Sequence, residues 1–341
     1  MFYNELVENK RLSSQENEEE VVENILRPRN LKEYIGQEKI KDGLWVFIQA
    51  AKKRKEPLEH ILFYGPPGLG KTTLAHVLAN ETGSRITITS GPAIERSGDL
   101  VSILTNLEDG DILFIDEVHR LNRAVEEVLY PAMEDYAVDV VIGKGPSAKT
   151  LRVDLPKFTL IGATTRVSML SSPLRDRFGL VQSLDFYEDK EVEKIIERSA
   201  NILEIGFEKN CLSDIAACSR KTPRVANRLL KRVRDFATVY NKGKVNKKII
   251  KQALDQLGVD EMGFDNVDRR YLSVLLKKFS GGPVGIETLS AASSIDRDTV
   301  EEVIEPYLMQ TGFIKRTPRG RVATPKAFEF FNLATQERLI K

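Results

Sequence analysis

The sequence predicts an α/β fold in which a parallel sheet is covered by helices and is followed by a small helical domain and a winged helix. Between Leu31 and about Tyr187, short apolar runs alternate with helical stretches, which is typical of a parallel sheet. Residues 188–258 show apolar positions at three- and four-residue spacing and no strand pattern. Residues 261–341 read as three helices and two short strands, the order of a winged helix.

The composition is that of a folded chain with more than one domain. Its 341 residues are 41% hydrophobic and 30% charged, and single cores rarely grow past about 250–300 residues. No apolar run approaches the roughly 20 residues of a membrane span, and the N-terminus lacks a signal-peptide core. Cys211 and Cys218 are interpreted as small buried apolar residues. We therefore expect a cytoplasmic protein with no membrane partner.

Charge is distributed unevenly along the chain. Residues 1–20 are polar and end in three glutamates, which predicts a disordered lead-in. Residues 219–260 contain twelve Lys or Arg against three Asp or Glu. This basic stretch is either an electrostatic footprint for nucleic acid or a set of solvated lysines on helix faces.

The first chemical motif is a phosphate-binding loop. Residues 65–72, GPPGLGKT, have the form G-x-x-x-x-G-K-[ST] between the expected strand Ile61–Tyr64 and the expected helix Thr73–Ala79. Glycines such as Gly68 and Gly70 let backbone N–H groups approach phosphates. Lys71 reaches the β- and γ-oxygens, and the Thr72 hydroxyl binds Mg²⁺. The helix N-terminus after the loop favours anions, so the motif predicts ATP and Mg²⁺ as cofactors.

The second motif places two carboxylates after a buried strand. The run ILFI precedes Asp116 and Glu117 about 45 residues after the loop. Asp116 is expected to hold Mg²⁺ through water, and Glu117 to polarise the attacking water. The other strands of this sheet are expected at residues 85–89, 111–115 and 158–163. Together the two motifs predict ATP hydrolysis.

Further polar residues follow later elements. Thr165 follows the strand IGAT and is expected to sense the γ-phosphate or to position the water, with a helix-cap role as the alternative. Arg175 and Arg177 end a short helix, and either is a candidate for an arginine supplied to a neighbouring subunit. Arg224 opens a helix of the second domain and is expected to close onto the phosphates.

Three domains are expected from these patterns. Residues 1–187 form the large ATPase domain, which includes a hairpin within 137–155 with strands at 138–142 and 149–153. Residues 188–258 form the small helical domain. Residues 259–341 form the winged-helix head, whose two strands are joined by RTPRG.

In this order, the motifs resemble those of AAA+ ATPases. The strings GPPGLGKTTLA, FIDEVHRLNRAVEEVLYPAMED, IGATTR, SPLRDRFG and RTPRGRVAT are closer still to the RuvB family of bacterial Holliday-junction branch-migration motors. The resemblance runs from about Leu26 to Phe330. It implies an ATP-driven ring, expected to be hexameric, that moves double-stranded DNA during recombination and repair.

The resemblance also implies roles for individual residues. It assigns catalytic or sensing roles to Lys71, Asp116, Glu117, Thr165, Arg177 and Arg224. It implies further nucleotide contacts by Leu26, Arg27, Gly68, Gly70, Thr72, Thr73, Glu134, Asp135, Tyr136 and Tyr187, with metal contacts by Thr72 and Asp116. On the head it implies DNA contacts by Arg297, Arg316 and Arg321, to which Arg319 would add charge.

The implied partners are a Holliday junction, other copies of the chain, RuvA, and RuvC indirectly. The hairpin after Tyr136 matches the family element that docks RuvA, and its Val140, Val141 and Ile142 are expected to be exposed. The head arginines have few apolar neighbours, which suits phosphate contact without sequence preference.

Two other functions use the same parts. A clamp-loader-like or origin-binding ATPase would use ATP as a switch, but such proteins more often carry Ser-Arg-Cys where this chain has Arg-Asp-Arg. A transcription factor would read bases with its recognition helix, whereas residues 300–310 are mostly acidic and apolar.

Overall fold

The computed structural model describes residues 23–142, 149–208 and 211–333. The expected disordered lead-in, residues 1–20, lies outside these described residues. Contacts divide the described chain into two compact units. One unit contains the residues up to Gly65 together with Leu69–Asp185, and the other contains Pro66–Gly68 and the chain from Phe186 onward.

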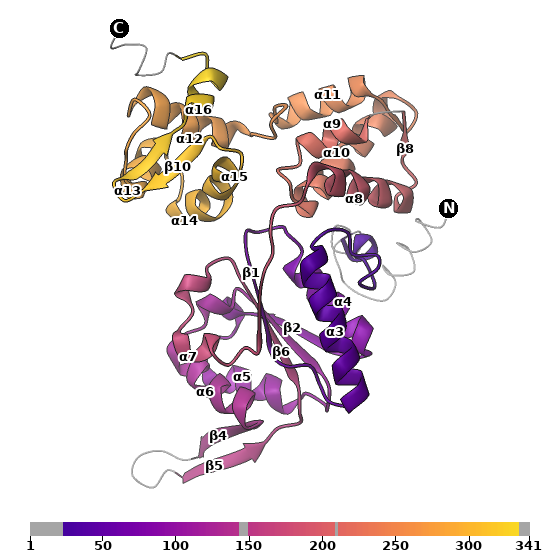
Figure 1. Cartoon of the computed structure of the whole chain (residues 1–341), viewed down its shortest axis with the longest axis vertical. Helices are drawn as coiled ribbons and strands as arrows, with labels where there is room; N and C mark the ends of the chain where they lie inside the picture. The colour runs from indigo at the N-terminus through magenta and orange to yellow at the C-terminus, as the bar shows by residue number, and fades with distance from the viewer. Residues whose placement is uncertain (1–22, 143–148, 209–210, 334–341) are drawn as a thin grey trace. The chain divides into compact units, whose positions relative to one another are not determined.

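The first unit is built on a parallel sheet, as predicted, and this sheet has five strands (Figure 1). The strand order is β2–β3–β6–β1–β7, so the strand before the phosphate loop is flanked by β6 and β7. The strands are β1 Ile61–Tyr64, β2 Ile86–Ser90, β3 Ile112–Asp116, β6 Thr159–Thr164 and β7 Leu180–Ser183. Strands β3 and β6 are almost entirely buried, as their continuous apolar runs require in a sheet covered on both faces.

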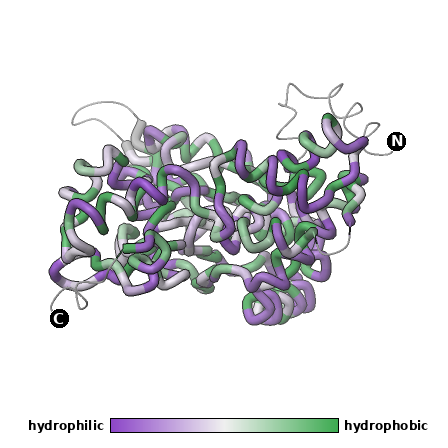
Figure 2. Tube along the Cα trace, turned by 90° about the horizontal axis from the view of Figure 1, so that it is seen from above, coloured by the Kyte–Doolittle hydropathy of each residue, from purple (hydrophilic) through white to green (hydrophobic). Residues whose placement is uncertain are grey.

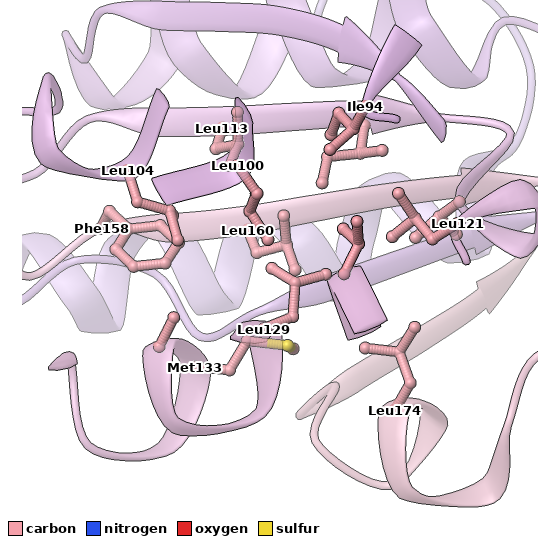
Figure 3. Close-up of a cluster of buried hydrophobic side chains, with 14 of the residues drawn as sticks. Ile94, Leu100, Leu104, Leu113, Leu121, Leu129, Met133, Phe158, Leu160 and Leu174 are labelled. Atoms are coloured by element: carbon pink, nitrogen blue, oxygen red, sulfur yellow. The ribbon is translucent and has the colours of Figure 1, made fainter. Parts of the chain in front are cut away.

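Helices cover both faces of this sheet. In Figure 1, α3 (Glu38–Arg54) and α4 (Lys71–Thr82) lie to one side of the strands, and α5 (Ser97–Thr105) and α6 (Arg123–Glu134) lie to the other. On the α5–α6 side, Leu100, Leu129 and Leu160 belong to one buried cluster (Figure 3). Fully burying each such side chain contributes about 1.5–3 kcal/mol, so this cluster holds the sheet that positions the site.

Short elements complete the unit. Helix α6 begins after Asn122, whose side chain accepts a hydrogen bond from the Val125 N–H. Strands β4 (Ala137–Ile142) and β5 (Lys149–Asp154) form the expected antiparallel hairpin. Helix α7 (Ser172–Arg175) precedes the edge strand β7.

The second unit contains the helical segment and the head. Its first four helices are α8 (Asp189–Ile202), α9 (Leu212–Ala217), α10 (Pro223–Tyr240) and α11 (Lys247–Leu257). The buried residues of α10 include Leu229, Leu230 and Val233, at the spacing of one helix face. Thr222 caps α10 by accepting from the Val225 N–H, and Pro223 occupies the first turn, where no donor is required.

The head has the winged-helix order that the sequence predicted. Helices α12 (Asn266–Lys277) and α13 (Ile286–Ser293) precede a third helical stretch made of α14 (Arg297–Thr299), a π-helical turn (Val300–Ile304) and α15 (Glu305–Gln310). Strands β10 (Ile314–Thr317) and β11 (Gly320–Ala323) form the wing, and α16 (Pro325–Phe330) follows. Phe264 and Phe313 pack edge to face in the core of the head, with ring centroids 4.8 Å apart.

Some sequence-based predictions of elements were wrong. Strand β7 was not expected, because Leu180–Ser183 is a partly exposed edge strand with only two apolar residues. The helical segment was expected to lack strands, yet Gly206–Phe207 (β8) and Lys244–Val245 (β9) pair in parallel. On the wing, Arg316 and Thr317 belong to β10, so the turn consists of Pro318 and Arg319 alone.

Hydrophobic and hydrophilic residues alternate along the described trace (Figure 2). Among the residues that the structure describes, no helix combines the length and the apolar character that a membrane crossing requires.

Candidate nucleotide site and nucleic-acid interface

The predicted nucleotide-binding residues follow three neighbouring strands. The loop from Gly65 follows β1, Thr165 follows β6, and Asp116 ends β3. Strand β6 pairs with both β1 and β3, with Tyr64 opposite Thr164 and Ile115 opposite Gly162. Because the carboxyl ends of parallel strands share one edge, the sheet brings these three segments together. Ligands of open α/β sheets bind at this edge.

The phosphate loop is shaped by left-handed glycines and by a residue that sequence reasoning missed. Gly70 has φ +98°, and a Cβ atom there would lie 2.7 Å from the Tyr34 hydroxyl oxygen. Tyr34 is buried, and its hydroxyl donates to the Leu69 carbonyl at 3.3 Å. Tyr34 therefore supports the loop from outside the motif. It lies 35 residues before Leu69 in the chain, so no local pattern signalled it.

Lys71 begins helix α4 and is 8% exposed. Its Nζ donates to the Gly65 carbonyl at 2.7 Å, which folds the side chain back over the loop. Thr72 and Thr73 follow in the first turn of the helix. The ammonium group and the N-terminal N–H groups of α4 thus face the same loop, as anion binding requires.

The two carboxylates at the end of β3 have different surroundings. The Glu117 N–H donates to Asp116 Oδ1 at 2.9 Å, which orients the Asp116 carboxylate. Glu117 has φ +47°, in the left-handed region, and its Oε2 accepts from Arg120 Nη1 at 2.9 Å. A strained residue at a strand end is common in functional sites, and here it turns Glu117 away from the strand direction.

A second link joins β6 to the segment after β3. The Thr164 hydroxyl and His119 Nδ1 are 2.9 Å apart, and the Arg166 N–H donates to the same hydroxyl at 2.9 Å. Thr164 is buried, while its neighbour Thr165 is half-buried. This link fixes the backbone from which Thr165 projects. The sequence alone left open whether His119 supports the site or only the fold.

Arg27, one of the residues expected around the nucleoside, contacts α4. Leu26 is buried, and Arg27 Nη1 lies 2.8 Å from His76 Nε2. Burial lowers the pKa of His76, and the positive charge of Arg27 lowers it further. A neutral His76 can accept a hydrogen bond from Arg27, so it holds this arginine in place.

Each member of the predicted trio Glu134, Asp135 and Tyr136 has a partner within its own unit. Glu134 Oε2 accepts from Arg177 Nη2 at 2.8 Å, and Asp135 Oδ2 accepts from Arg152 Nη2 at 2.6 Å, at the base of the hairpin. The Tyr136 ring packs edge to face on Phe158 at 5.9 Å. Nucleotide contact by this trio remains a prediction.

The two candidate finger arginines differ in their contacts. Arg177 is held by Glu134 and by the Pro173 carbonyl, and its guanidinium lies 4.7 Å from the centroid of the Tyr130 ring. Arg175 is more exposed, and its ion pair is with the adjacent Asp176, at 3.9 Å. Among the described residues, the recorded partners of Arg177 all lie in α6 and α7 and not in the phosphate loop.

In the second unit, the start of α10 contacts Gly68, a phosphate-loop residue that belongs to the same unit. The Arg224 N–H donates to the Gly68 carbonyl at 3.4 Å. The Tyr187 N–H donates to the Lys221 carbonyl at 3.0 Å, three residues before Arg224. The structure thus brings Gly68, Tyr187 and Arg224 close to one turn. The nucleotide-sensing role of Arg224 remains a prediction.

The three head arginines are ion-paired to carboxylates. Arg297 pairs with Glu287 and Glu301, and half of its side chain is exposed. Arg316, also half exposed, donates from Nη2 to Glu305 at 2.7 Å. Arg321 is buried and donates from Nε to Glu305, also at 2.7 Å. Arg297 and Arg316 are thus half exposed and Arg321 is buried, and DNA contact by the three arginines remains a prediction.

The carboxylate of Glu305 is fully buried and accepts a third partner, the Tyr271 hydroxyl, at 2.9 Å. Burial raises the pKa of Glu305, but hydrogen bonds from Arg321, Arg316 and Tyr271 outweigh it, so the pKa lies below its ordinary value. The buried group is therefore charged. Lys315 and Arg319 are exposed on the wing beside Arg316, and sequence reasoning did not single out Lys315.

The expected exposure of the hairpin residues is not confirmed at Val140. Val140 is half-buried and packs on the core of its own unit. The side chains of Val141 and Ile142 lie outside the described residues. On the opposite strand, Leu151 is 52% exposed and pairs with Val140.

A phosphate loop, paired carboxylates at a strand end, a helical lid and a winged helix together define an AAA+ P-loop ATPase. Sequence models of three domains match this chain. The Holliday junction DNA helicase RuvB P-loop domain matches residues 26–184, the RuvB AAA lid domain residues 187–260, and the RuvB C-terminal winged helix domain residues 261–332. The chain belongs to the RuvB family.

Full-length relatives agree with this assignment. The Holliday junction branch migration complex subunit RuvB of Clostridium kluyveri is 60% identical over 307 residues, which cover 90% of this chain and 88% of the relative. The Thermotoga maritima RuvB Holliday junction branch migration motor superposes with a TM-score of 0.84 at 47% identity, covering 91% of this chain and 99% of that one. A single-residue variant of that protein gives a TM-score of 0.85.

Proposed function

We propose that this protein is an ATP-driven DNA translocase that moves the branch point of Holliday junctions during recombination and repair. The observation that carries the proposal is the complete set of motor parts in one chain, at 60% identity to a branch migration subunit over 90% of its length. The proposal includes helicase-type ATP hydrolysis, because translocation against paired strands consumes nucleotide continuously.

The nucleotide is ATP with Mg²⁺. Mg²⁺ is usually held by one or two protein oxygens and the substrate phosphates. Thr72 and Asp116 supply these oxygens, and bound Mg²⁺ would neutralise charge on the β- and γ-phosphates. Lys71 binds the same phosphates, Glu117 orients the water, and Thr165 and Arg224 sense the γ-phosphate.

The working assembly is a ring, which we take to be a hexamer. Arg177 would reach the γ-phosphate of the neighbouring subunit and stabilise charge on the transferring phosphoryl group. Two features support Arg177 over Arg175. Its guanidinium is held by three contacts, and these contacts use residues away from the loop of its own subunit.

DNA binds to the head through phosphates. Arg297 and Arg316 present exposed guanidinium groups, and Lys315 and Arg319 add charge on the wing. The third helical stretch carries the partly exposed Glu301 and Glu302, which disfavour its insertion against bases. Binding should therefore ignore sequence and weaken as salt rises.

The remaining expectations complete the proposal. Residues 1–187, 188–258 and 259–341 act as large domain, lid and head. The hairpin within 137–155 docks RuvA, through which RuvC is engaged indirectly. A motor that acts on bacterial recombination intermediates works in the cytoplasm.

A synthetic four-way junction with RuvA tests the proposal. The parent protein should separate the junction in the presence of ATP, and Lys71→Ala should lose both ATP binding and separation. Glu117→Gln is the matched control, because it should bind ATP and assemble while hydrolysis falls by a factor of about 10² or more. Tight binding to one DNA sequence without ATP turnover would instead identify a regulator or a switch.

A further inference from the structure

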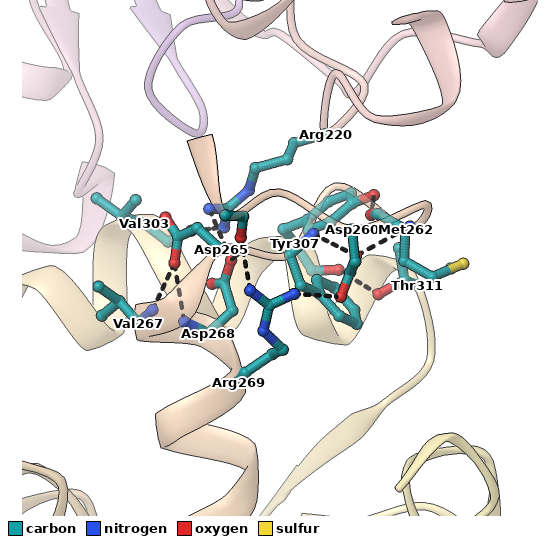
Figure 4. Close-up of polar contacts among 12 residues, drawn as sticks. Arg220, Asp260, Met262, Asp265, Val267, Asp268, Arg269, Val303, Tyr307 and Thr311 are labelled. Atoms are coloured by element: carbon teal, nitrogen blue, oxygen red, sulfur yellow. Dashed lines mark hydrogen bonds and ion pairs between the residues drawn. The ribbon is translucent and has the colours of Figure 1, made fainter. Parts of the chain in front are cut away.

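Within the second unit, Arg220 connects the lid to the head. It lies in the turn before α10, four residues before Arg224. Its guanidinium contacts three parts of the head: the Asp268 carboxylate on α12, the Val303 carbonyl in the π-helical turn, and the Tyr307 ring on α15 (Figure 4). These partners are 48 to 87 residues away in the chain, so local structure does not explain the contacts.

The contacts are well formed and largely buried. Arg220 Nη1 donates to Asp268 Oδ2 at 3.2 Å, with side-chain exposures of 11% and 1%. Nη2 donates to the Val303 carbonyl at 2.8 Å, and the guanidinium carbon lies 5.0 Å from the centroid of the Tyr307 ring. A planar guanidinium can satisfy these three partners at once, whereas a lysine ammonium cannot.

The turn that contains Arg220 has a strained backbone. Arg220 and Lys221 have φ of +52° and +55°, two successive residues in the left-handed region that side chains disfavour. Such conformations persist where surrounding contacts hold them. Here Arg220 is held by the head, and the Lys221 carbonyl accepts the N–H of Tyr187.

The head side of the contact is the helical stretch that precedes the wing. This stretch is interrupted by the π-helical turn Val300–Ile304, and Pro306 removes one backbone donor from the next turn. Arg220 supplies a donor to Val303 from outside the helix. Two residues after Val303, Glu305 anchors Arg316 and Arg321 of the wing. A short path therefore runs from the lid to the residues expected to meet DNA.

The lid side of the contact is the nucleotide sensor. Thr222 caps α10, and Arg224 lies on its first turn. Phe186 also reaches the head, with its ring 6.4 Å from that of Tyr307. Phe186 and Tyr187 form the connection that leads into the lid. The two segments proposed to respond to nucleotide are this connection and the start of α10. The first lies beside Tyr307, and the second directly follows the turn that contains Arg220.

We propose that Arg220 is a positioning residue that fixes the head to the lid, so that rotation of the lid by nucleotide is transmitted to the DNA-bound wing. The proposal deepens the proposed function and rests on it for the direction of transmission. On this proposal the lid and the head move together as a rigid unit, and the Arg220 guanidinium holds them in a fixed orientation. Without Arg220, ATP would still be hydrolysed, but the lid would rotate without moving the head by the same amount.

The direct test is a distance measurement in the full chain. Single fluorophores are placed at Val239→Cys on the lid and Glu329→Cys on the head, both exposed, while native Cys211 and Cys218 are buried. The parent should give one narrow distance distribution, and Arg220→Ala should broaden it. Arg232→Ala is the control, since Arg232 lies on α10 and pairs with Asp235 at the same 3.2 Å but in solvent. A distribution in Arg220→Ala as narrow as the parent's would overturn the proposal.

The functional test compares junction separation with ATP consumed. Arg220→Ala should keep basal ATPase and duplex affinity within about twofold of the parent, yet separate about tenfold fewer junctions per ATP. Separation per ATP equal to that of the parent would also overturn the proposal. If the parent itself moves no junctions, the proposed function fails, and the distance measurement still decides the role of Arg220.

A conservative variant guards against simple misfolding. Arg220→Lys keeps the charge and one hydrogen bond to Asp268 but loses the planar contact with Tyr307 and the second donor to Val303. Its distance distribution and its separation per ATP should fall between those of the parent and Arg220→Ala. A merely structural role would instead lower the melting temperature of both variants and leave separation per ATP unchanged in the folded fraction.

Discussion

Arg177 and Glu134 form a short ion pair, with 2.8 Å between Nη2 and Oε2, at the junction of α6 and α7. The guanidinium lies over the Tyr130 ring, and its Nε is buried without a hydrogen-bond partner among the described residues. The Tyr130 hydroxyl contacts Ser171 at 3.2 Å and Glu126 at 3.1 Å. The proposed finger is therefore oriented by its own subunit before any neighbour arrives.

We predict that Glu134→Ala lowers the ATPase rate of the assembled ring by about tenfold. A misplaced catalytic group can cost up to about 100-fold, and Glu134 sets the direction of Arg177. Glu134→Gln keeps a hydrogen-bond acceptor and should lose less. Steady-state turnover and nucleotide binding measured on the same preparations decide this. Unchanged turnover in Glu134→Ala would show that Arg177 needs no such support.

A second prediction concerns the buried carboxylate of the head. Glu305→Ala should destabilise the head by about 3–5 kcal/mol, because the buried guanidinium of Arg321 loses its nearer carboxylate and keeps only Glu301, at 3.6 Å. Since the pKa of Glu305 is lowered in the folded head, its stabilisation is present above the ordinary glutamate pKa and is lost as pH falls through the lower folded value. Amide exchange of β10 and β11 in the full chain measures this. Equal protection in variant and parent contradicts it.

Substitutions of the two wing arginines, Arg316 and Arg321, should differ in their effects on DNA binding. Arg316 is half exposed, so Arg316→Ala should weaken duplex binding for all sequences and reduce the salt slope by about one. Arg321 is buried against Glu305, so Arg321→Ala should mainly lower stability. Titrations of random duplex at several salt concentrations, with melting curves, distinguish the two. A salt slope unchanged in Arg316→Ala would remove this residue from the DNA surface.

Asp268 should give the head an unusual pH dependence. Burial raises its pKa to about 6, although Arg220 acts in the opposite direction. The folded head therefore binds this proton more tightly than the unfolded chain does. The contribution of Asp268 to stability then falls as pH rises from about 4 to about 6, by on the order of 3 kcal/mol, and is flat above.

Asp268→Asn provides the comparison, because the amide does not titrate. The protection of α12 amides in the parent, relative to Asp268→Asn at the same pH, should decline across this window. A difference that is constant or that grows with pH would contradict a raised pKa. Comparison at equal pH removes the intrinsic pH dependence of exchange and the titration of other carboxylates.

The sequence predicted those parts of the fold and site that local pattern determines. The buried runs before Gly65, Asp116 and Thr165 predicted three strands that the structure contains. The polar residues at the carboxyl ends of these strands predicted where the nucleotide site lies. Strand β7 was missed because an edge strand with one exposed face carries a weak apolar signal. The supports provided by Tyr34 and Arg220 were missed, and the partner of His119 was not identified, because these contacts join residues 35 to 87 positions apart and no single sequence shows such pairings.

Mixed rings test most directly whether an arginine from one subunit completes the site of the next. Lys71→Ala subunits lack a working loop but carry Arg177, and Arg177→Ala subunits carry the loop but lack the finger. Each variant alone should be nearly inactive, since such a finger contributes a factor of about 10³ or more. Mixed in equal amounts, they should recover about a quarter of the parental ATPase rate, because roughly one site in four combines both intact residues. An inactive mixture of well-assembled rings, or full activity of Arg177→Ala alone, would contradict the account.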